Sequence, residues 1–208
     1  MSTPQSWFLT DADELAARHK YTFYKSPRDI IEKVSVGEVV KLIFQFESDD
    51  PEAPSAERMW VLVDEIGQDG KFKGRLNNEP RYIKDLKLDD PIDFSACHII
   101  NTEHDDDENL VERYIKRCFV TNRVLEDGVR AGCLYREEPG EEKDSGWRIT
   151  ANDESDEYMD DSKNCAYVSL GAVLTKDDSF IHLLDSPVGA AFIRVSETGE
   201  FVALPSEG

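Results

Sequence analysis

Large apolar side chains recur at every second position of residues 38–46, and this pattern constrains the fold more than any other feature of the chain. A period of two is typical of a β-strand that buries one face. The residues of that face are Val40, Leu42, Phe44 and Phe46. Residues 59–66 and 71–76 predict two more strands on either side of a glycine-containing turn, and residues 92–100 predict another. We therefore expect the first half of the chain to form a mainly antiparallel sheet.

Short helices are expected to accompany the strands. Residues 11–18 and 28–34 each follow residues that favour a helix start. In the second half, a helix over residues 108–116 should lead into a strand over 117–122 that forms a hairpin with 129–136. Further strands are predicted at residues 147–149 and 166–170, a helix at 177–184, and a closing hairpin from 189–195 and 201–204. The fold class is α+β, with two small modules, each a mainly antiparallel sheet packed with short helices.

A run of acidic residues marks the boundary between the modules. Residues 104–108 read His-Asp-Asp-Asp-Glu, and like charges in a chain repel and favour solvent. Residues 1–100 hold 19 acidic and 13 basic residues, whereas residues 101–208 hold 25 and 11. We therefore divide the chain into domains 1–105 and 106–208.

The net charge limits the partners of the chain. With 44 acidic against 24 basic residues, the formal charge is −20. Phosphate backbones and anionic membrane surfaces would be repelled, so no nucleic-acid or membrane partner is expected, and a protein partner should be neutral or basic. The first 18 residues contain no signal-peptide pattern, and four widely spaced cysteines suit reduced thiols, so we expect a cytoplasmic protein.

Motifs of known chemistry are absent. The chain has no phosphate-binding loop, no dinucleotide-binding glycine motif and no hydrolase nucleophile elbow. Residue types of a catalytic triad occur at Ser179, His182, Asp185 and Ser186. Residue types that bind zinc occur at Cys97, His98, His104 and Cys118. Because neither set has an organised spacing, we expect no catalytic residue, no metal and no cofactor.

The most unusual segment is residues 153–161, which places six carboxylates in nine positions. Three interpretations stay open: a calcium loop, a solvated surface and a partner-binding patch. An EF-hand needs glycine and glutamate at its sixth and twelfth positions, where this chain has Tyr158 and Asn164. Trp147 and Met159 supply the residue types that anchor interfaces, while the acids would steer a basic partner. Core packing is the alternative for Trp147, since a lone tryptophan in a strand is usually buried, and by the same logic Phe119 and Tyr135 are expected in the core.

The second half resembles a bacterial family through a series of motifs in fixed order. They are CFVTNR at 118–123, GCLYREEP at 132–139, DSGWR at 144–148, the acidic segment at 153–161 and LLDSPVG at 183–189. Residues 117–195 are similar to the immunity-protein family numbered thirty-three in the bacterial polymorphic-toxin classification.

The first half resembles a second family. Residues 37–44 (GEVVKLIF), 57–61 (ERMWV) and 74–80 (GRLNNEP) are similar to an uncharacterised, YegJ-like bacterial domain. This resemblance covers about residues 36–100 and implies no known function.

The resemblance of the second half implies an immunity protein that neutralises a cognate toxin by direct binding, without catalysis. We place the toxin-facing surface in residues 137–161. The residues expected to contact the toxin are Glu137, Glu138, Asp144, Trp147, Asp153, Glu154, Asp156, Glu157, Tyr158, Asp160 and Asp161. The alternatives are an acidic regulatory or scaffold protein with another basic partner and, less favoured, a hydrolase. A toxin gene beside the gene of this chain would favour immunity.

Overall fold

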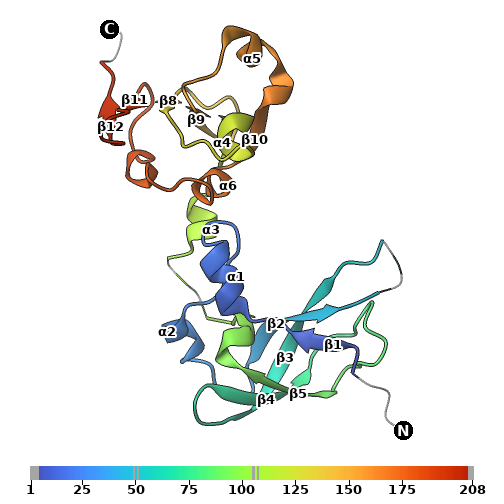
Figure 1. Cartoon of the computed structure of the whole chain (residues 1–208). Coiled ribbons are helices and arrows are strands. Elements are labelled where there is room, and N and C mark those ends of the chain that lie inside the picture. The colour runs from blue at the N-terminus through green and yellow to red at the C-terminus, as the bar shows by residue number, and fades with distance from the viewer. Residues whose placement is uncertain (1–4, 49, 51, 105, 107, 206–208) are drawn as a thin grey trace. The chain divides into compact units, whose positions relative to one another are not determined.

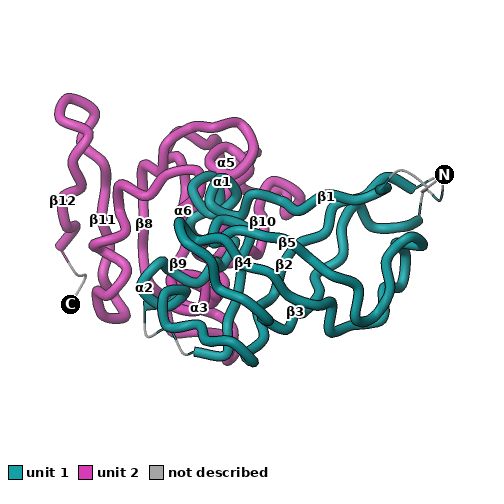
Figure 2. The backbone as a smooth tube through the Cα atoms, turned by 90° about the horizontal axis from the view of Figure 1, so that it is seen from below, with its two compact units in different colours: residues 1–109 teal, residues 110–208 magenta. Residues whose placement is uncertain are grey.

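The chain folds into two compact units, residues 1–109 and 110–208 (Figure 2). The computed structural model describes residues 5–48, 50, 52–104, 106 and 108–205. Each unit has its own sheet, and the helices of both are short (Figure 1). The sheets are mostly antiparallel, which confirms the expected α+β class.

The first unit is an antiparallel sheet in the order β1-β2-β3-β4-β5, with β6 paired to β2. Its strands are β1 (Trp7–Leu9), β2 (Val39–Phe46), β3 (Ala56–Ile66), β4 (Lys71–Leu76), β5 (Pro91–Ser95) and β6 (Ile99–Asn101). Its helices are α1 (Ala12–Arg18), α2 (Arg28–Ile31) and the 3₁₀ turn η1 (Ala96–His98).

The alternating pattern of β2 defines the core of this unit. Val40, Leu42 and Phe44 are completely buried and Phe46 nearly so, as the pattern predicts. The strand expected at residues 92–100 is wrong in one respect, because η1 divides it into β5 and β6. The cause is local: the Ser95 backbone N–H donates to Nδ1 of His98 at 3.1 Å, which turns the chain between the two strands. Helix α1 agrees with the expected bounds to within one residue, whereas α2 is shorter than expected and ends at Ile31.

The second unit is a sheet in the order β10-β7-β9-β8-β11-β12, in which only β7 and β9 run parallel among the described pairs. Its strands are β7 (Arg117–Thr121), β8 (Cys133–Arg136), β9 (Asp144–Thr150), β10 (Cys165–Ser169), β11 (Ala191–Arg194) and β12 (Phe201–Ala203). Its helices are α3 (Leu110–Arg113), α4 (Asn122–Leu125), α5 (Asp156–Asp160), α6 (Leu170–Leu174) and the 3₁₀ turns η2 (Ser162–Asn164) and η3 (Ile181–Leu183).

Two sequence predictions for this unit are wrong. The expected hairpin of β7 with residues 129–136 does not form, because α4 follows β7 directly and leads the chain away; β8 pairs with β9 and β11 instead. The expected helix at 177–184 is reduced to η3, and Asp177 accepts hydrogen bonds from the backbone N–H and hydroxyl of Ser179. The closing hairpin is present as β11 and β12.

One face of this sheet forms the core of the second unit. Alternate residues of three neighbouring strands are almost completely inaccessible to solvent: Cys118, Val120, Leu134, Trp147 and Ile149. Helices α4 and α6 contact β7, and they also reach β9 and β10, respectively. The residues between these buried positions point to the opposite face of the sheet, as the pleat of a strand requires.

Candidate functional site

The acidic residues singled out in the sequence form two groups separated by β9. The first lies in residues 137–144, which connect β8 to β9 and include the start of β9. The second lies in residues 153–161, between the end of β9 and β10. Because β9 runs from one group to the other, the structure places them at opposite ends of this strand.

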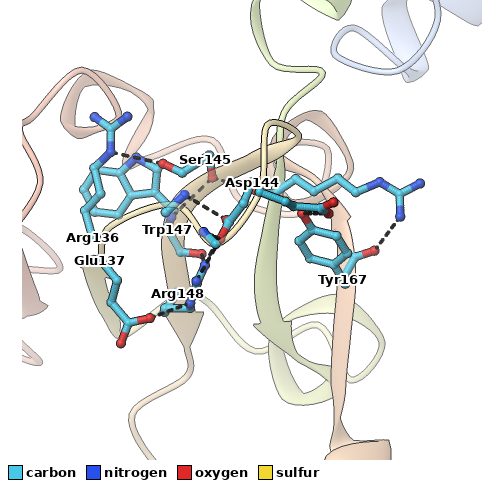
Figure 3. A network of polar contacts seen from close by, with 11 residues as sticks. Arg136, Glu137, Asp144, Ser145, Trp147, Arg148 and Tyr167 are labelled. Carbon is cyan, nitrogen blue, oxygen red and sulfur yellow. Dashed lines mark hydrogen bonds and ion pairs between the residues drawn. The ribbon is translucent and has the colours of Figure 1, made fainter.

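The first group is organised by a buried ion pair between Asp144 and Arg148 (Figure 3). Arg148 donates to both carboxylate oxygens of Asp144, at 3.1 and 2.9 Å, and its Nε donates to Glu137 at 2.9 Å. The backbone N–H groups of Gly140 and Gly146 donate to the same carboxylate at 3.0 and 2.8 Å. The bonds from Arg148 and the two glycines hold the pKa of Asp144 well below its ordinary value.

Gly146 is required where the chain enters β9. Its φ of +82° is a conformation that side chains other than glycine rarely adopt. A Cβ atom at this position would lie 2.2 Å from the carbonyl oxygen of Glu137, which is far inside van der Waals contact. The Gly146 N–H is also one of the donors to Asp144. The motif DSGWR therefore fixes a turn and an ion pair together.

Trp147 and Asp144 are structural residues, which corrects their assignment to the toxin-facing surface. Trp147 is completely buried, and its indole N–H donates to the carbonyl oxygen of Leu184 at 3.2 Å. The Arg136 guanidinium lies 5.7 Å from the centroid of its ring (Figure 3). The ring centroid of Phe192 lies 6.4 Å from that of Trp147. Asp144 is only 3% exposed. Neither side chain can meet a partner without unfolding this part of the sheet.

In the second group, Asp153 and Glu154 hold the loop after β9. Asp153 pairs with Arg123 of α4 at 2.7 Å, and this hydrogen bond lowers the pKa of Asp153. Glu154 accepts hydrogen bonds from the hydroxyl of Thr121 at 2.5 Å and from the backbone N–H of Ala151 at 2.8 Å. Both carboxylates therefore have partners within the unit.

The remaining acids of the second group lie on or beside α5. Ser155 caps this helix by accepting from the Tyr158 N–H at 3.2 Å. Tyr158 is half-buried, Met159 is exposed, and Asp161 accepts a hydrogen bond from the backbone N–H of Lys163. The carboxylates of Asp156, Glu157 and Asp160 are exposed and take part in no ion pair with any other residue that the structure describes. With Glu137 and Glu138, they are the predicted contact residues most open to a partner.

The rival metal and triad sets are not assembled. Across the described residues, no three His, Cys, Asp or Glu side chains come together in a way that would hold a metal ion. The hydroxyl of Ser179 donates to Asp177, and Asp185 pairs with Arg113 at 3.1 Å.

The described part of the chain contains no helix with the length and hydropathy needed to cross a bilayer.

Sequence reasoning missed a set of exposed aromatic residues. Phe119 and Tyr135, expected in the core, are 41% and 38% exposed. The assignment was wrong because both lie on the face of the sheet opposite Val120 and Leu134, which are the buried residues of the same strands. The charged residue Arg148 lies opposite both of them in the register of the neighbouring strands. Its charge is the sequence feature that indicates that this face is not the core.

The fold and the site define a two-unit α+β protein with an acidic segment in its second unit. Residues 118–205 match the family model described as the immunity protein Imm33 domain. Residues 6–116 match the model of an uncharacterised protein conserved in bacteria (DUF2314), and because this match spans more than half of the chain, the chain belongs to that family. No curated protein and no solved structure matches the chain. The family matches confirm both resemblances found in the sequence and support an immunity role.

Proposed function

We propose that this protein neutralises a cognate bacterial toxin by binding it through the acidic segment 137–161 of the second unit. The proposal involves no catalytic step. The Imm33 match supports immunity, and four free cysteines support a location in the reducing cytoplasm, where a toxin would have to be met before it acts.

The observation that carries the proposal is the distribution of charge. Residues 110–208 contain 20 acidic and 11 basic residues. Residues 137–161 alone contain 11 acidic residues but only two basic ones, Lys143 and Arg148. The rest of the second unit is therefore neutral, and its whole excess of negative charge belongs to this one segment. Such a concentrated field accelerates association with a basic protein.

The three free carboxylates of the second group, Asp156, Glu157 and Asp160, are the residues to test. Asp153 and Glu154 are unsuitable, because changing them would also break the contacts of the loop with Arg123 and Thr121. The test variant is the triple D156N/E157Q/D160N. The toxin for the test is the purified product of a toxin gene found next to the gene of this chain. Its binding to the variant is measured by surface plasmon resonance at several salt concentrations.

We expect the triple variant to bind with an association rate about 10-fold or more below that of the wild type at low salt, and with a weaker dependence on salt. The matched control is E126Q/E197Q/E200Q, which removes three exposed charges of the same unit outside the segment. If the wild type does not bind the toxin, the proposed function is wrong. If the test variant and the control variant slow association equally, the net charge of the unit and not the segment 137–161 steers the toxin, and the proposed surface is wrong.

A further inference from the structure

The second sheet has an open face that carries a row of aromatic side chains. Tyr167 of β10 pairs in register with Phe119 of β7, Phe119 pairs with Arg148 of β9, and Arg148 pairs with Tyr135 of β8. These four residues alternate with the buried residues of their strands, so they share the face opposite the core. We call them the aromatic row.

Three members of the aromatic row, Tyr167, Phe119 and Arg148, contact one another. The rings of Phe119 and Tyr167 stack with centroids 4.8 Å apart. The Arg148 guanidinium lies 4.8 Å from the centroid of Phe119, and that of Arg117 lies 5.3 Å from Tyr167. Asp144 and Glu137 hold the Arg148 side chain (Figure 3). The guanidinium beside Phe119 is therefore held in place before any partner arrives.

A row of this kind is unusual on a free surface. Single exposed aromatic residues need no explanation, but contiguous aromatic and arginine side chains are the residue types enriched at the centres of protein interfaces. Phe119 and Tyr135 are each about 40% exposed, so part of both rings remains to be covered. Arginine stacked on a ring adds contact area without the cost of ordering a loose side chain.

The two acidic groups lie on either side of the aromatic row, because the row crosses β9 and the groups lie at the two ends of that strand. At the end where the parallel strands β7 and β9 begin, the Tyr167 hydroxyl donates to Glu141 at 2.8 Å and Arg148 pairs with Glu137. At the end where these strands finish, Glu154 accepts from Thr121. The charge concentrated in residues 137–161 thus flanks an aromatic centre on both sides.

We infer that this open face is the surface that contacts the toxin, and that the toxin presents an apolar patch flanked by lysine or arginine side chains. The inference rests on the proposed function and adds the contact surface to it. The apolar patch covers Phe119, Tyr135 and Tyr167, while the flanking cations meet the carboxylates on each side of the row. A nucleic acid does not fit, because those carboxylates would repel its phosphates.

The experiment uses the full chain and the variant F119T/Y135T, which removes two rings and keeps residues that favour strands. We expect its Kd for the toxin to rise about 100-fold or more, mostly through faster dissociation and with an unchanged dependence on salt. The matched control is F8T, since Phe8 is an exposed phenylalanine of β1 in the first unit. Circular dichroism establishes that each variant is folded.

A labelling experiment on the wild type avoids any effect of substitution on folding. Nitration of Tyr135 is expected to fall at least about 5-fold in the toxin complex, whereas nitration of Tyr82 in the first unit stays unchanged. If the toxin binds but F119T/Y135T binds like F8T and Tyr135 stays reactive, the inference fails while the proposed function stands. If Tyr135 is protected without toxin in a dimer, the face belongs to a second copy of the chain and the inference is also wrong.

Discussion

Replacing Asp144 by asparagine should destabilise the second unit strongly. Each carboxylate oxygen of Asp144 accepts one bond from Arg148 and one from a glycine N–H. Asparagine keeps one oxygen and replaces the other by an NH₂ group. Two of these four bonds are therefore lost whichever way the amide is turned, and the NH₂ group then faces the N–H groups of Arg148 and of a glycine, which are also donors. A hydrogen bond to a charged group contributes about 1.5–3 kcal/mol. Breaking a buried ion pair costs about 3–5 kcal/mol, so we expect a loss in this range for D144N.

The loss is measured by urea unfolding followed by tryptophan fluorescence. In a W7F/W60F background, Trp147 is the sole tryptophan and reports on the second unit alone. With an m-value of about 2 kcal/mol/M, D144N should lower the unfolding midpoint by roughly 2 M. The matched control is D185N, because Asp185 forms an exposed ion pair with Arg113 and should contribute less than about 1 kcal/mol. Equal losses for D144N and D185N would refute the reasoning.

The same ion pair predicts how stability depends on pH. The pKa of Asp144 is lowered in the folded state from its ordinary value of 3.8 by the bonds from Arg148 and the glycine N–H groups. Between the two pKa values the unfolded chain binds more protons, so the stability due to Asp144 is complete near neutral pH and is lost as the pH falls below about 4. The difference in the free energy of unfolding between the wild type and D144N should therefore become smaller from pH 6 to pH 2. A constant difference would contradict the assignment.

Two further predictions concern the same end of the sheet. W147A should reduce the free energy of unfolding by about 3–5 kcal/mol, because it opens a cavity at a completely buried residue; far-UV circular dichroism in urea measures the loss. G146A should lower stability by more than about 3 kcal/mol, because it combines a positive φ with a Cβ 2.2 Å from a carbonyl oxygen. G37A, at a φ of +93° with nothing within 4 Å of the new Cβ, should cost only about 1 kcal/mol, and thermal unfolding of the two variants compares them directly.

The first unit was predictable because its strands bury one face and expose the other. β2 and β4 have the alternating burial that their sequences indicate, and both lie within one residue of the expected bounds. The break between β5 and β6 was not predictable from periodicity, because it depends on a single hydrogen bond between Ser95 and His98. Patterns of hydrophobicity report the environment of a segment and not the local bonds that interrupt it.

The candidate site was predictable as a charged segment but not as a geometry. The density of carboxylates in residues 137–161 is visible in the sequence, and most of them are exposed. Which of these carboxylates bind other parts of the unit and which stay unpaired depends on partners that are distant in the chain. Thr121 lies 33 residues from the Glu154 that it contacts, and Arg123 lies 30 residues from Asp153. Sequence spacing therefore could not distinguish the structural acids from those free to bind.

The open face can be recognised from the order of the strands but not from their amino-acid composition. Aromatic residues supply both cores and interfaces, so Phe119 and Tyr135 could be assigned to either from their strands alone. Arg148 is the residue that distinguishes its side of β9 from the core side of Trp147 and Ile149, because a charged side chain is costly to bury without charged partners such as Asp144 and Glu137. Transferring that information to β7 and β8 requires knowing that both strands flank β9, whereas the sequence suggested that they pair with each other. Once the strand order is known, the register places both aromatic residues beside Arg148, on the face of the sheet opposite the core.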